Sequence, residues 1–130
     1  MRDSGIFYVD FSDTVTVEDI KNYLFEFARL DNLPKNIYLL YDLTEVDMNL
    51  ELVDISFISK LAEKVTSSYK TIRTAFLVDK PKITAYSILF NVDTSSEKIL
   101  RNAFSTEEAA LKWLKQQVSY NNPAKRILEL

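Results

Sequence analysis

The 130-residue chain contains no histidine and no cysteine. Without histidine, it lacks the Ser-His and Cys-His pairs of nucleophilic catalysis and the commonest side-chain ligand of transition metals. Without cysteine, disulfide bonds, thiol catalysis and thiolate metal sites are excluded, and the composition fits a reducing compartment. These two absences favour a protein that is not an enzyme.

Glycine is almost absent too, since Gly5 is the single one in the chain. Phosphate-binding loops and dinucleotide-binding turns need several glycines, because the backbone has to approach the phosphates closely. Nucleotide binding by either route is therefore excluded. We expect the protein to work without a cofactor.

The chain has no excess of cationic residues and no long apolar run. The chain has 16 Lys and Arg against 19 Asp and Glu, whereas sequence-independent binding to nucleic acid or to anionic membranes relies on a cationic excess. No segment approaches the roughly 18 apolar residues of a membrane span, and residues 1–5 lack the apolar core of a secretory signal. We expect a cytoplasmic protein that binds no nucleic acid and has no membrane span.

Apolar residues are plentiful, at 47% of the chain. This content is enough to bury one core and too high for a disordered chain. The run from Asn36 to Thr44 is almost unbroken apolar until Asp42, which is typical of a central strand covered on both faces. Residues 45–49 are expected to form the loop that leaves this strand, at the end of the sheet where open α/β sheets place their working loops.

Strands and helices are expected to alternate along the chain. Capping-box patterns predict the starts of the first and last helices, at Thr16–Asp19 and Ser105–Glu108. Asn49 and Asp54 are both possible N-caps of the second helix, whose apolar stripe includes Val53 and Phe57 and is expected to face the core. Further strands are predicted over residues 6–11, 71–78 and 99–104, and helices over residues 16–30, 50–65, 81–90 and 105–118.

This alternation predicts the fold class and the domain organisation. We expect one α/β domain over residues 1–118 with right-handed crossovers between its strands. Its four-stranded sheet would be mostly parallel or mixed, with about four helices packed on it. Residues 119–130 are expected to form a polar tail, because Asn121, Asn122 and Pro123 interrupt the last helix.

Acidic side chains gather after the first two predicted strands. Asp10 and Asp13 follow the first, and Asp42, Glu45 and Asp47 follow the second. If the two strands are parallel neighbours, these acids share one end of the sheet, where their oxygens could hold a hard cation. Loop acids are usually solvated, however, and a strand-end aspartate such as Asp42 commonly accepts hydrogen bonds from the amides that follow it. We expect no metal site here.

Aromatic residues are numerous, with seven Tyr and eight Phe. Most of them are expected in the core. An aromatic excess that lines a gap between sheet and helices is also how a protein holds a lipid or another small apolar ligand. A carrier or sensor of such a ligand is therefore the alternative function.

Two segments carry a resemblance to a known family. Tyr41-Asp42-Leu43-Thr44 closes the central strand, and residues 104–114 (FSTEEAALKWL) form the last strand-to-helix turn. They resemble the SpoIIAA-like branch of the STAS family, the anti-sigma-factor-antagonist fold, whose members often end in a Phe-x-Thr-Glu-x-x-Ala-x-x-Trp-Leu pattern. The element order is similar over residues 5–117. The resemblance implies a regulatory interaction domain, with helices on a mixed sheet and no chemistry of its own.

The resemblance also implies a place for regulation. Regulatory members carry a phosphorylatable Ser or Thr in an Asp-Ser-Ser/Thr-Gly turn at the start of the second helix, where a phosphate repels the partner kinase. The corresponding residues here, Val53-Asp54-Ile55-Ser56-Phe57, keep only Asp54 and Ser56 and have no glycine. Ser56 is the nearest candidate for phosphorylation, and a helix-surface or capping serine is its ordinary alternative.

We therefore expect a STAS-like domain that acts by protein–protein interaction. The expected contact surface is the area around the second helix and the loop from Thr44 to Asp54. Its candidate partner-binding residues are Asp42, Thr44, Glu45, Asp47, Asp54 and Ser56. The partner would be another protein, such as an anti-sigma-type kinase or regulator. Because the family commonly has a further strand before the first one, its absence here would leave a sheet edge open to a second copy, giving a homodimer.

Overall fold

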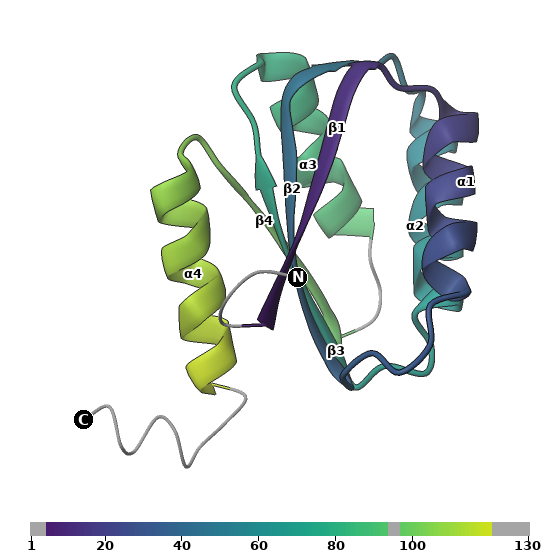
Figure 1. Ribbon diagram of the computed structural model, residues 1–130. Helices are drawn as coiled ribbons and strands as arrows, with labels where there is room; N and C mark the ends of the chain where they lie inside the picture. The colour runs from purple at the N-terminus through teal and green to yellow at the C-terminus, as the bar shows by residue number, and fades with distance from the viewer. Residues whose placement is uncertain (1–4, 94–96, 121–130) are drawn as a thin grey trace.

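The computed structural model describes residues 5–93 and 97–120 of the chain. Strands and helices alternate through these residues, as the sequence predicted (Figure 1). The elements are β1 (Ile6–Thr14), α1 (Val17–Ala28), β2 (Asn36–Asp47), α2 (Leu52–Val65), β3 (Thr71–Leu77), α3 (Pro81–Asp93), β4 (Ile99–Phe104) and α4 (Glu107–Tyr120). The predicted α/β class is confirmed.

The four strands form one sheet in the order β1-β2-β3-β4. All three strand pairings in the described part of the chain are parallel, so the alternative of a mixed sheet is wrong. β1 lies at one edge, where no described strand precedes it. Pairing of this edge with a second copy stays a prediction.

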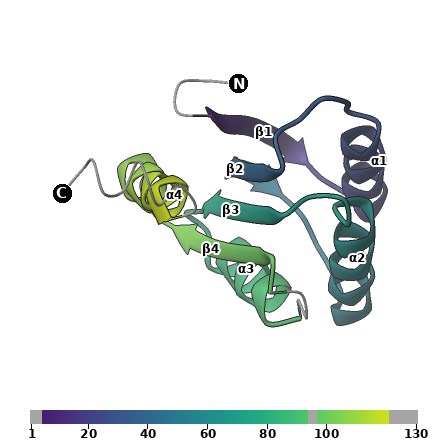
Figure 2. The same ribbon diagram turned by 90° about the horizontal axis from the view of Figure 1, so that it is seen from below.

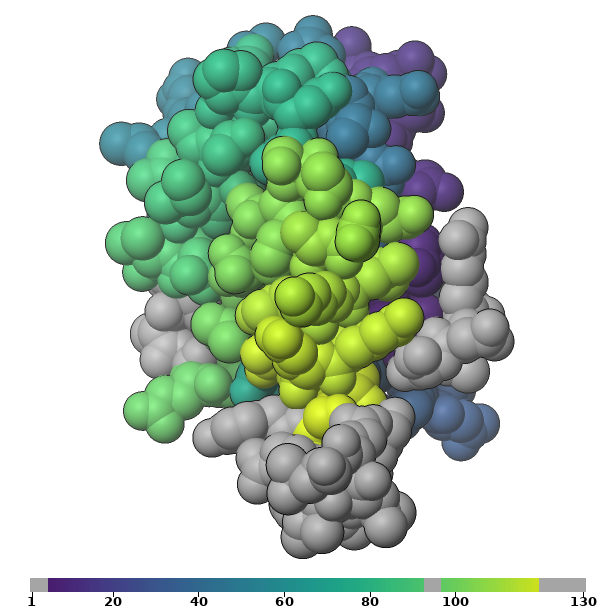
Figure 3. Space-filling view, turned by 90° about the vertical axis from the view of Figure 1, so that its left-hand side faces the viewer, coloured from purple at the N-terminus to yellow at the C-terminus, as the bar shows by residue number. Residues whose placement is uncertain are grey.

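The helices form two unequal layers. Right-handed crossovers between successive parallel neighbours place their helices on one face of a sheet. Figure 2 shows α1, α2 and α3 together on one side of the sheet and α4 on the other, and α2 contacts both α1 and α3. The space-filling view of the α4 side shows this helix across the middle of that face (Figure 3).

Strand β2 serves both layers, which explains its continuous apolar run. Tyr38 and Leu40 pack in the same buried cluster as Ala110 and Leu114 of α4. Leu39, between them in sequence, belongs to a cluster on the opposite face. A strand covered on both sides has no solvent-facing position in its middle, so apolar residues follow one another without polar interruption.

The sheet extends further than predicted at its carboxyl end. Residues 45–49 were expected to leave β2 as a loop, but the strand continues to Asp47. After an irregularity between Asp10 and Ser12, β1 also continues and pairs with the extension up to Thr14. The reason is Val46, which is buried at 1% exposure between two exposed acids and so turns one face of the extension inward.

Helix starts follow local hydrogen bonding. The predicted capping box of α1 is present, because Thr16 N donates to Asp19 Oδ2 over 2.8 Å and Asp19 N donates to Thr16 Oγ1 over 3.2 Å. α1 ends at Ala28 rather than near residue 30. At α2 both proposed N-caps are wrong: Glu51 is the N-cap.

The last helix is shifted relative to its prediction. Thr106 caps α4 in place of Ser105, since Thr106 Oγ1 accepts a hydrogen bond from Ala109 N over 3.2 Å. The helix continues to Tyr120, so residues 119 and 120 belong to the fold and not to the expected tail. Residues 121–130 lie outside the described part. Within that part, no helix combines the length and the apolar character that a membrane crossing needs.

One buried hydroxyl in α2 gives a test of the packing. Ser59 is 1% exposed, and its Oγ has no hydrogen-bond partner among the described residues. Ser59→Ala removes this unsatisfied group and should raise the free energy of unfolding by about 1 kcal/mol, as measured by urea denaturation.

Ser87→Ala is the matched control for Ser59→Ala. Ser87 is also buried in a helix, but its Oγ donates to the Thr84 carbonyl oxygen over 2.7 Å. Its removal should lower the free energy of unfolding by about 1 kcal/mol. Equal losses in both variants would show that Ser59 is satisfied in solution.

Candidate functional site

A cavity of about 120 Å³ lies between the sheet and helices α1, α2 and α3. Its sides come from α1, at Tyr23 and Phe27, and from α2, at Ile58 and Ala62. The sheet supplies the floor, and Phe90 of α3 contributes at one side. The expected gap between sheet and helices, lined by aromatic residues, is therefore present.

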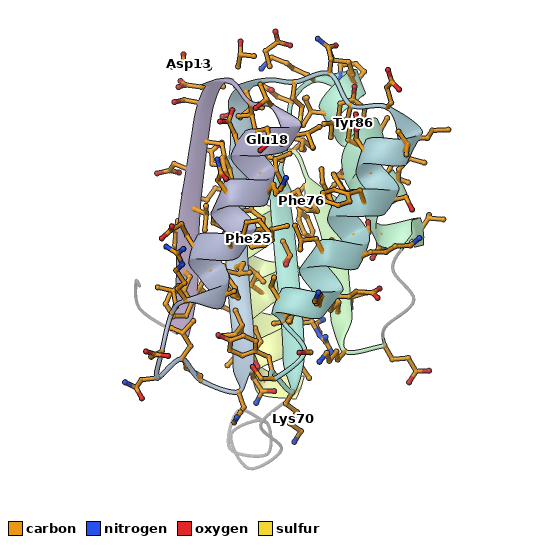
Figure 4. All side chains as sticks on the ribbon, turned by 90° about the vertical axis from the view of Figure 1, so that its right-hand side faces the viewer. Asp13, Glu18, Phe25, Lys70, Phe76 and Tyr86 are labelled. Atoms are coloured by element: carbon orange, nitrogen blue, oxygen red, sulfur yellow. The ribbon has the colours of Figure 1, made fainter. Side chains whose placement is uncertain are left out.

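Aromatic rings make up much of the wall. Phe11 of β1 lies edge-on to Tyr23, with 5.4 Å between ring centroids, and Tyr41 of β2 stacks on Phe76 of β3 at 5.6 Å. Figure 4 looks onto α1 and α2 and shows Phe76 in the space between these two helices. Ring pairs of this kind are rigid and apolar, so they favour flat or compact apolar groups inside the cavity.

Two tyrosine hydroxyls meet in this wall. Tyr23 Oη and Tyr41 Oη are 2.8 Å apart and share one hydrogen bond. Burial raises the pKa of Tyr23, and the neighbouring Tyr41 raises it further. Burial also raises the pKa of Tyr41, although the hydrogen bond with Tyr23 and the charge of Arg101 act in the opposite direction. Both phenols therefore stay neutral around pH 7.

The hydroxyl pair has one hydrogen to spare. Two O–H groups make one mutual hydrogen bond, because one donates and the other accepts. Among the described residues, Tyr23 and Tyr41 have no other hydrogen-bond partner. The pair therefore keeps one hydrogen that no described residue accepts.

Arg101 brings a positive charge to the same cavity. It lies on β4 opposite Thr74 of β3, lines the cavity together with Thr74, and is only 9% exposed. Its Nη1 donates to the Phe90 carbonyl oxygen and its backbone N donates to Asn91 Oδ1, each over 3.3 Å. Both acceptors belong to α3, so this helix binds the guanidinium through Phe90 and the backbone of β4 through Asn91.

The charge of Arg101 persists in spite of its burial. Loss of hydration lowers the pKa of its guanidinium, while Tyr41 and the half-buried Glu63 of α2 act in the opposite direction. A guanidinium starts from so high a pKa that it remains protonated in proteins. The cavity thus joins apolar walls to a cation and to neutral hydroxyl groups.

Sequence reasoning anticipated the aromatic wall but missed Arg101 and Thr74. In β4, Arg101 shares one face of the strand with Ile99 and Ala103, because alternate residues point to the same side. The other face carries Leu100 and Asn102. A charged residue on the apolar face of a short strand is a candidate for a site. That signal is visible only once the direction of each face is known.

The candidate partner-binding residues fall on two elements. Asp42, Thr44, Glu45 and Asp47 follow one another along the end of β2. Asp42 Oδ1 accepts hydrogen bonds from Thr44 N over 3.0 Å and from Thr44 Oγ1 over 2.7 Å. Asp42 therefore acts as a local hydrogen-bond acceptor, and Glu45 and Asp47 are exposed.

Asp54 and Ser56 lie in the first two turns of α2. Asp54 Oδ2 accepts from Glu51 N over 2.9 Å and so stabilises the helix start. Ser56 is half-buried. In the described part of the chain no group of three or more acids is arranged to hold a metal ion, although Asp10 does pair with Asp42 across the sheet.

The outer face of α2 differs from the prediction. Val53 and Phe57 were expected to face the core, but they are 69% and 47% exposed, and Leu52 is 73% exposed. Val53 and Phe57 are one helical turn apart and lie on the same side of the helix. We call Leu52, Val53 and Phe57 the α2 patch. It lies on the helix that was expected to contact a partner.

The hydroxyl pair can be tested by a double-mutant cycle. Tyr23→Phe or Tyr41→Phe alone leaves one buried hydroxyl without its partner, whereas the double variant removes both. We expect the two substitutions to be coupled by about 1 kcal/mol in the free energy of unfolding, measured by denaturant titration.

Tyr86 supplies the control for this cycle. Its hydroxyl accepts a hydrogen bond from Leu50 N over 2.9 Å and shares none with the pair. Tyr23→Phe combined with Tyr86→Phe should be additive. Additive behaviour of Tyr23→Phe with Tyr41→Phe would contradict the shared hydrogen bond.

Comparison of the chain with protein-family models, with curated proteins and with solved structures gives no match. No relative therefore supplies a ligand or a partner. What the chain does has to follow from its own geometry, above all from the cavity and the α2 patch.

Proposed function

We propose that the protein binds a small apolar ligand in the cavity between the sheet and α1, α2 and α3, as a carrier or sensor. The observation that carries this proposal is the cavity of about 120 Å³ itself, with its aromatic walls and few polar groups. Ligand sites are typically of this kind, largely formed in advance and mostly apolar, with a small number of placed polar groups.

The volume limits the size of the ligand. An apolar cavity of about 150 Å³ is known to hold benzene, so the 120 Å³ here suits one ring or a short branched chain. Membrane lipids are far larger. Of the lipid and the small apolar ligand considered from sequence, the small ligand is the one that fits.

The chemistry of the cavity supports binding rather than catalysis. General acid–base catalysis is most effective when the pKa of the catalytic group lies near the working pH. The pKa values of Tyr23 and Tyr41 are raised away from neutrality, and the chain has no histidine or cysteine. We therefore propose a non-enzymatic protein.

A cavity-filling substitution tests the proposal. Ala62→Leu adds apolar volume from α2 directly into the cavity and leaves the walls apolar. We expect toluene to bind the unaltered chain saturably and to bind Ala62→Leu at least about 10-fold more weakly, because the space is taken. Chemical-shift titration by NMR measures both affinities.

Ala85→Leu is the control for Ala62→Leu, since Ala85 is exposed on α3 and takes the same added volume into solvent. It should bind toluene like the unaltered chain. Absence of saturable binding to the unaltered chain, or equal affinity in Ala62→Leu, would contradict a ligand-binding cavity.

A second function is favoured by the α2 patch. We propose that Leu52, Val53 and Phe57 form part of a contact surface for another protein, because large apolar side chains that are exposed together mark interaction sites. Glu45, Asp47 and Glu51 are exposed on the segment before the helix. The complementary partner surface is apolar and edged with Lys or Arg.

This second proposal agrees with the resemblance to the SpoIIAA-like branch of the STAS family. In its regulatory members the start of the second helix is where a phosphate repels a partner kinase, and the α2 patch occupies that region. Ser56 is half-buried beside Phe57, and a phosphate there would add about −2 charge to an apolar surface. The proposed partner is an anti-sigma-type kinase or regulator.

Charge placed on the α2 patch tests the partner surface. Val53→Lys with Phe57→Lys should abolish capture of any partner that the unaltered chain retains, because cations replace the apolar contacts. Affinity capture from native lysate, followed by identification of the retained proteins, is the measurement.

Ile88→Lys with Val92→Lys on α3 is the matched control, since these residues are also one turn apart and 55% and 75% exposed. The control should retain the partner. Loss of the partner from both double variants, or from the α3 variant alone, would count against the α2 patch.

A further inference from the structure

We infer that the α2 patch binds a second copy of the chain, with the two α2 helices side by side and running in opposite directions. This inference rests on the second proposed function, in which the patch is a contact surface for a protein. It adds a second copy as an occupant of that surface. It also assigns Glu51, Lys60 and Lys64 as the charged residues that set the direction of the pair.

The first support is a stripe of exposed side chains on one side of α2, at intervals of four, three and four residues. The stripe consists of Val53, Phe57, Lys60 and Lys64. Because a helix has about 3.6 residues per turn, these intervals keep the side chains on the same side. The buried residues that lie between them in sequence are Ile55, Ile58 and Ser59. The stripe is therefore the side of α2 that is turned away from the core.

The second support is the change of charge along this side of the molecule. Exposed acids come just before α2, at Glu45, Asp47 and Glu51. The first half of the stripe is apolar, and the second half carries Lys60 and Lys64. Neither of these lysines forms an ion pair with a described residue. The surface thus runs from acidic through apolar to basic, so a reversed copy of it is its complement.

The same polarity extends over the face that α1 and α2 form. Figure 4 shows Asp13 and Glu18 at the end where both helices begin and Lys70 at the opposite end, and all three side chains are exposed. A two-fold arrangement with antiparallel helices brings the acidic end of one copy to the basic end of the other. A parallel arrangement would put acid against acid and base against base. Charge therefore selects the antiparallel arrangement.

The spacing of the stripe predicts the register of the pair. With the two-fold axis midway between Val53 and Phe57, each of these residues lies opposite the other one in the second copy. At 1.5 Å per residue, Lys60 is then about 7.5 Å beyond the axis and Glu51 about 6 Å before it, so the two lie opposite each other. Lys64 extends past the start of the second helix, toward the exposed acids before it. The apolar contacts hold the pair together, and the charges orient it.

Reversal of the charges tests this arrangement. The unaltered chain should form a reversible dimer whose fraction rises with protein concentration, because one helix pair is a small interface. Lys60→Glu with Lys64→Glu puts acids against acids, and Glu45→Lys with Glu51→Lys puts bases against bases. Each double variant should raise the dissociation constant of the dimer at least about 10-fold. Sedimentation velocity over a concentration series measures this constant.

A mixture of the two reversed variants is the decisive sample. In a heterodimer of one with the other, both ends again join opposite charges, so mixing should restore the dimer. Restored association also shows that both variants are folded. Loss of the dimer in each variant alone is then a result of charge and not of unfolding.

Lys112→Glu with Lys115→Glu is the matched control. Both lysines are exposed on α4, which lies on the other side of the sheet (Figure 2). The control changes the net charge by the same amount as Lys60→Glu with Lys64→Glu and should dimerise like the unaltered chain.

The possible failures are distinct. An unaltered chain that stays monomeric at all concentrations overturns self-association, while capture with the Val53→Lys and Phe57→Lys variant still decides whether the patch binds another protein. A dimer that both reversed variants retain lies on another surface, such as the β1 edge, and overturns the inference. Reversed variants that stay monomeric when mixed, or a control that also loses the dimer, overturn the charge pairing at α2.

Discussion

The sequential order of four parallel strands is the constraint on which the site depends. Each crossover joins neighbouring strands in the same direction, so α1, α2 and α3 lie on one face of the sheet. The other face is left to α4, which packs on β2, β3 and β4. Side chains of these three helices and of the sheet meet on that face. The space that remains on this side is filled largely by aromatic rings, and the cavity lies among them.

The two helix layers have different roles: α4 covers one face of the sheet, and α3 on the other side binds Arg101. On the α4 side, Ala110 and Leu114 are fully buried and hold the middle of the sheet from behind. On the opposite side, α3 fixes Arg101 through Phe90 O and Asn91 Oδ1. Arg101 is therefore held by a strand and a helix rather than by a loop. Rigid elements of this kind are what a small pre-formed site needs, because loosely held side chains would lose freedom on binding.

Much of the fold could be predicted from sequence, because local patterns decide it. The apolar run of β2 and the capping box at Thr16 are properties of neighbouring residues. The exposure of Val53 and Phe57 is not a property of neighbouring residues. Periodicity shows that apolar residues share a helix face, but the arrangement of the other elements decides whether that face is covered. The same limit hid the inward position of Arg101. The extension of β2 was missed because it depends on pairing with a distant segment. Strand β1 continues beyond its irregularity between Asp10 and Ser12 and pairs with the residues around Val46.

Helix α2 connects the two candidate functions. Its inner side lines the cavity at Ile58 and Ala62, while its outer side carries the exposed Val53 and Phe57. Protein interiors are close-packed, so a ligand that needs more room than the cavity offers must displace a wall. Because α2 is one continuous helix, displacement of its inner side also moves the outer one. Ligand binding and partner binding are thus compatible in one protein. A ligand that fits without displacing α2 leaves the α2 patch unchanged. Ligand binding therefore affects partner binding only if the ligand binds one position of α2 more tightly than another.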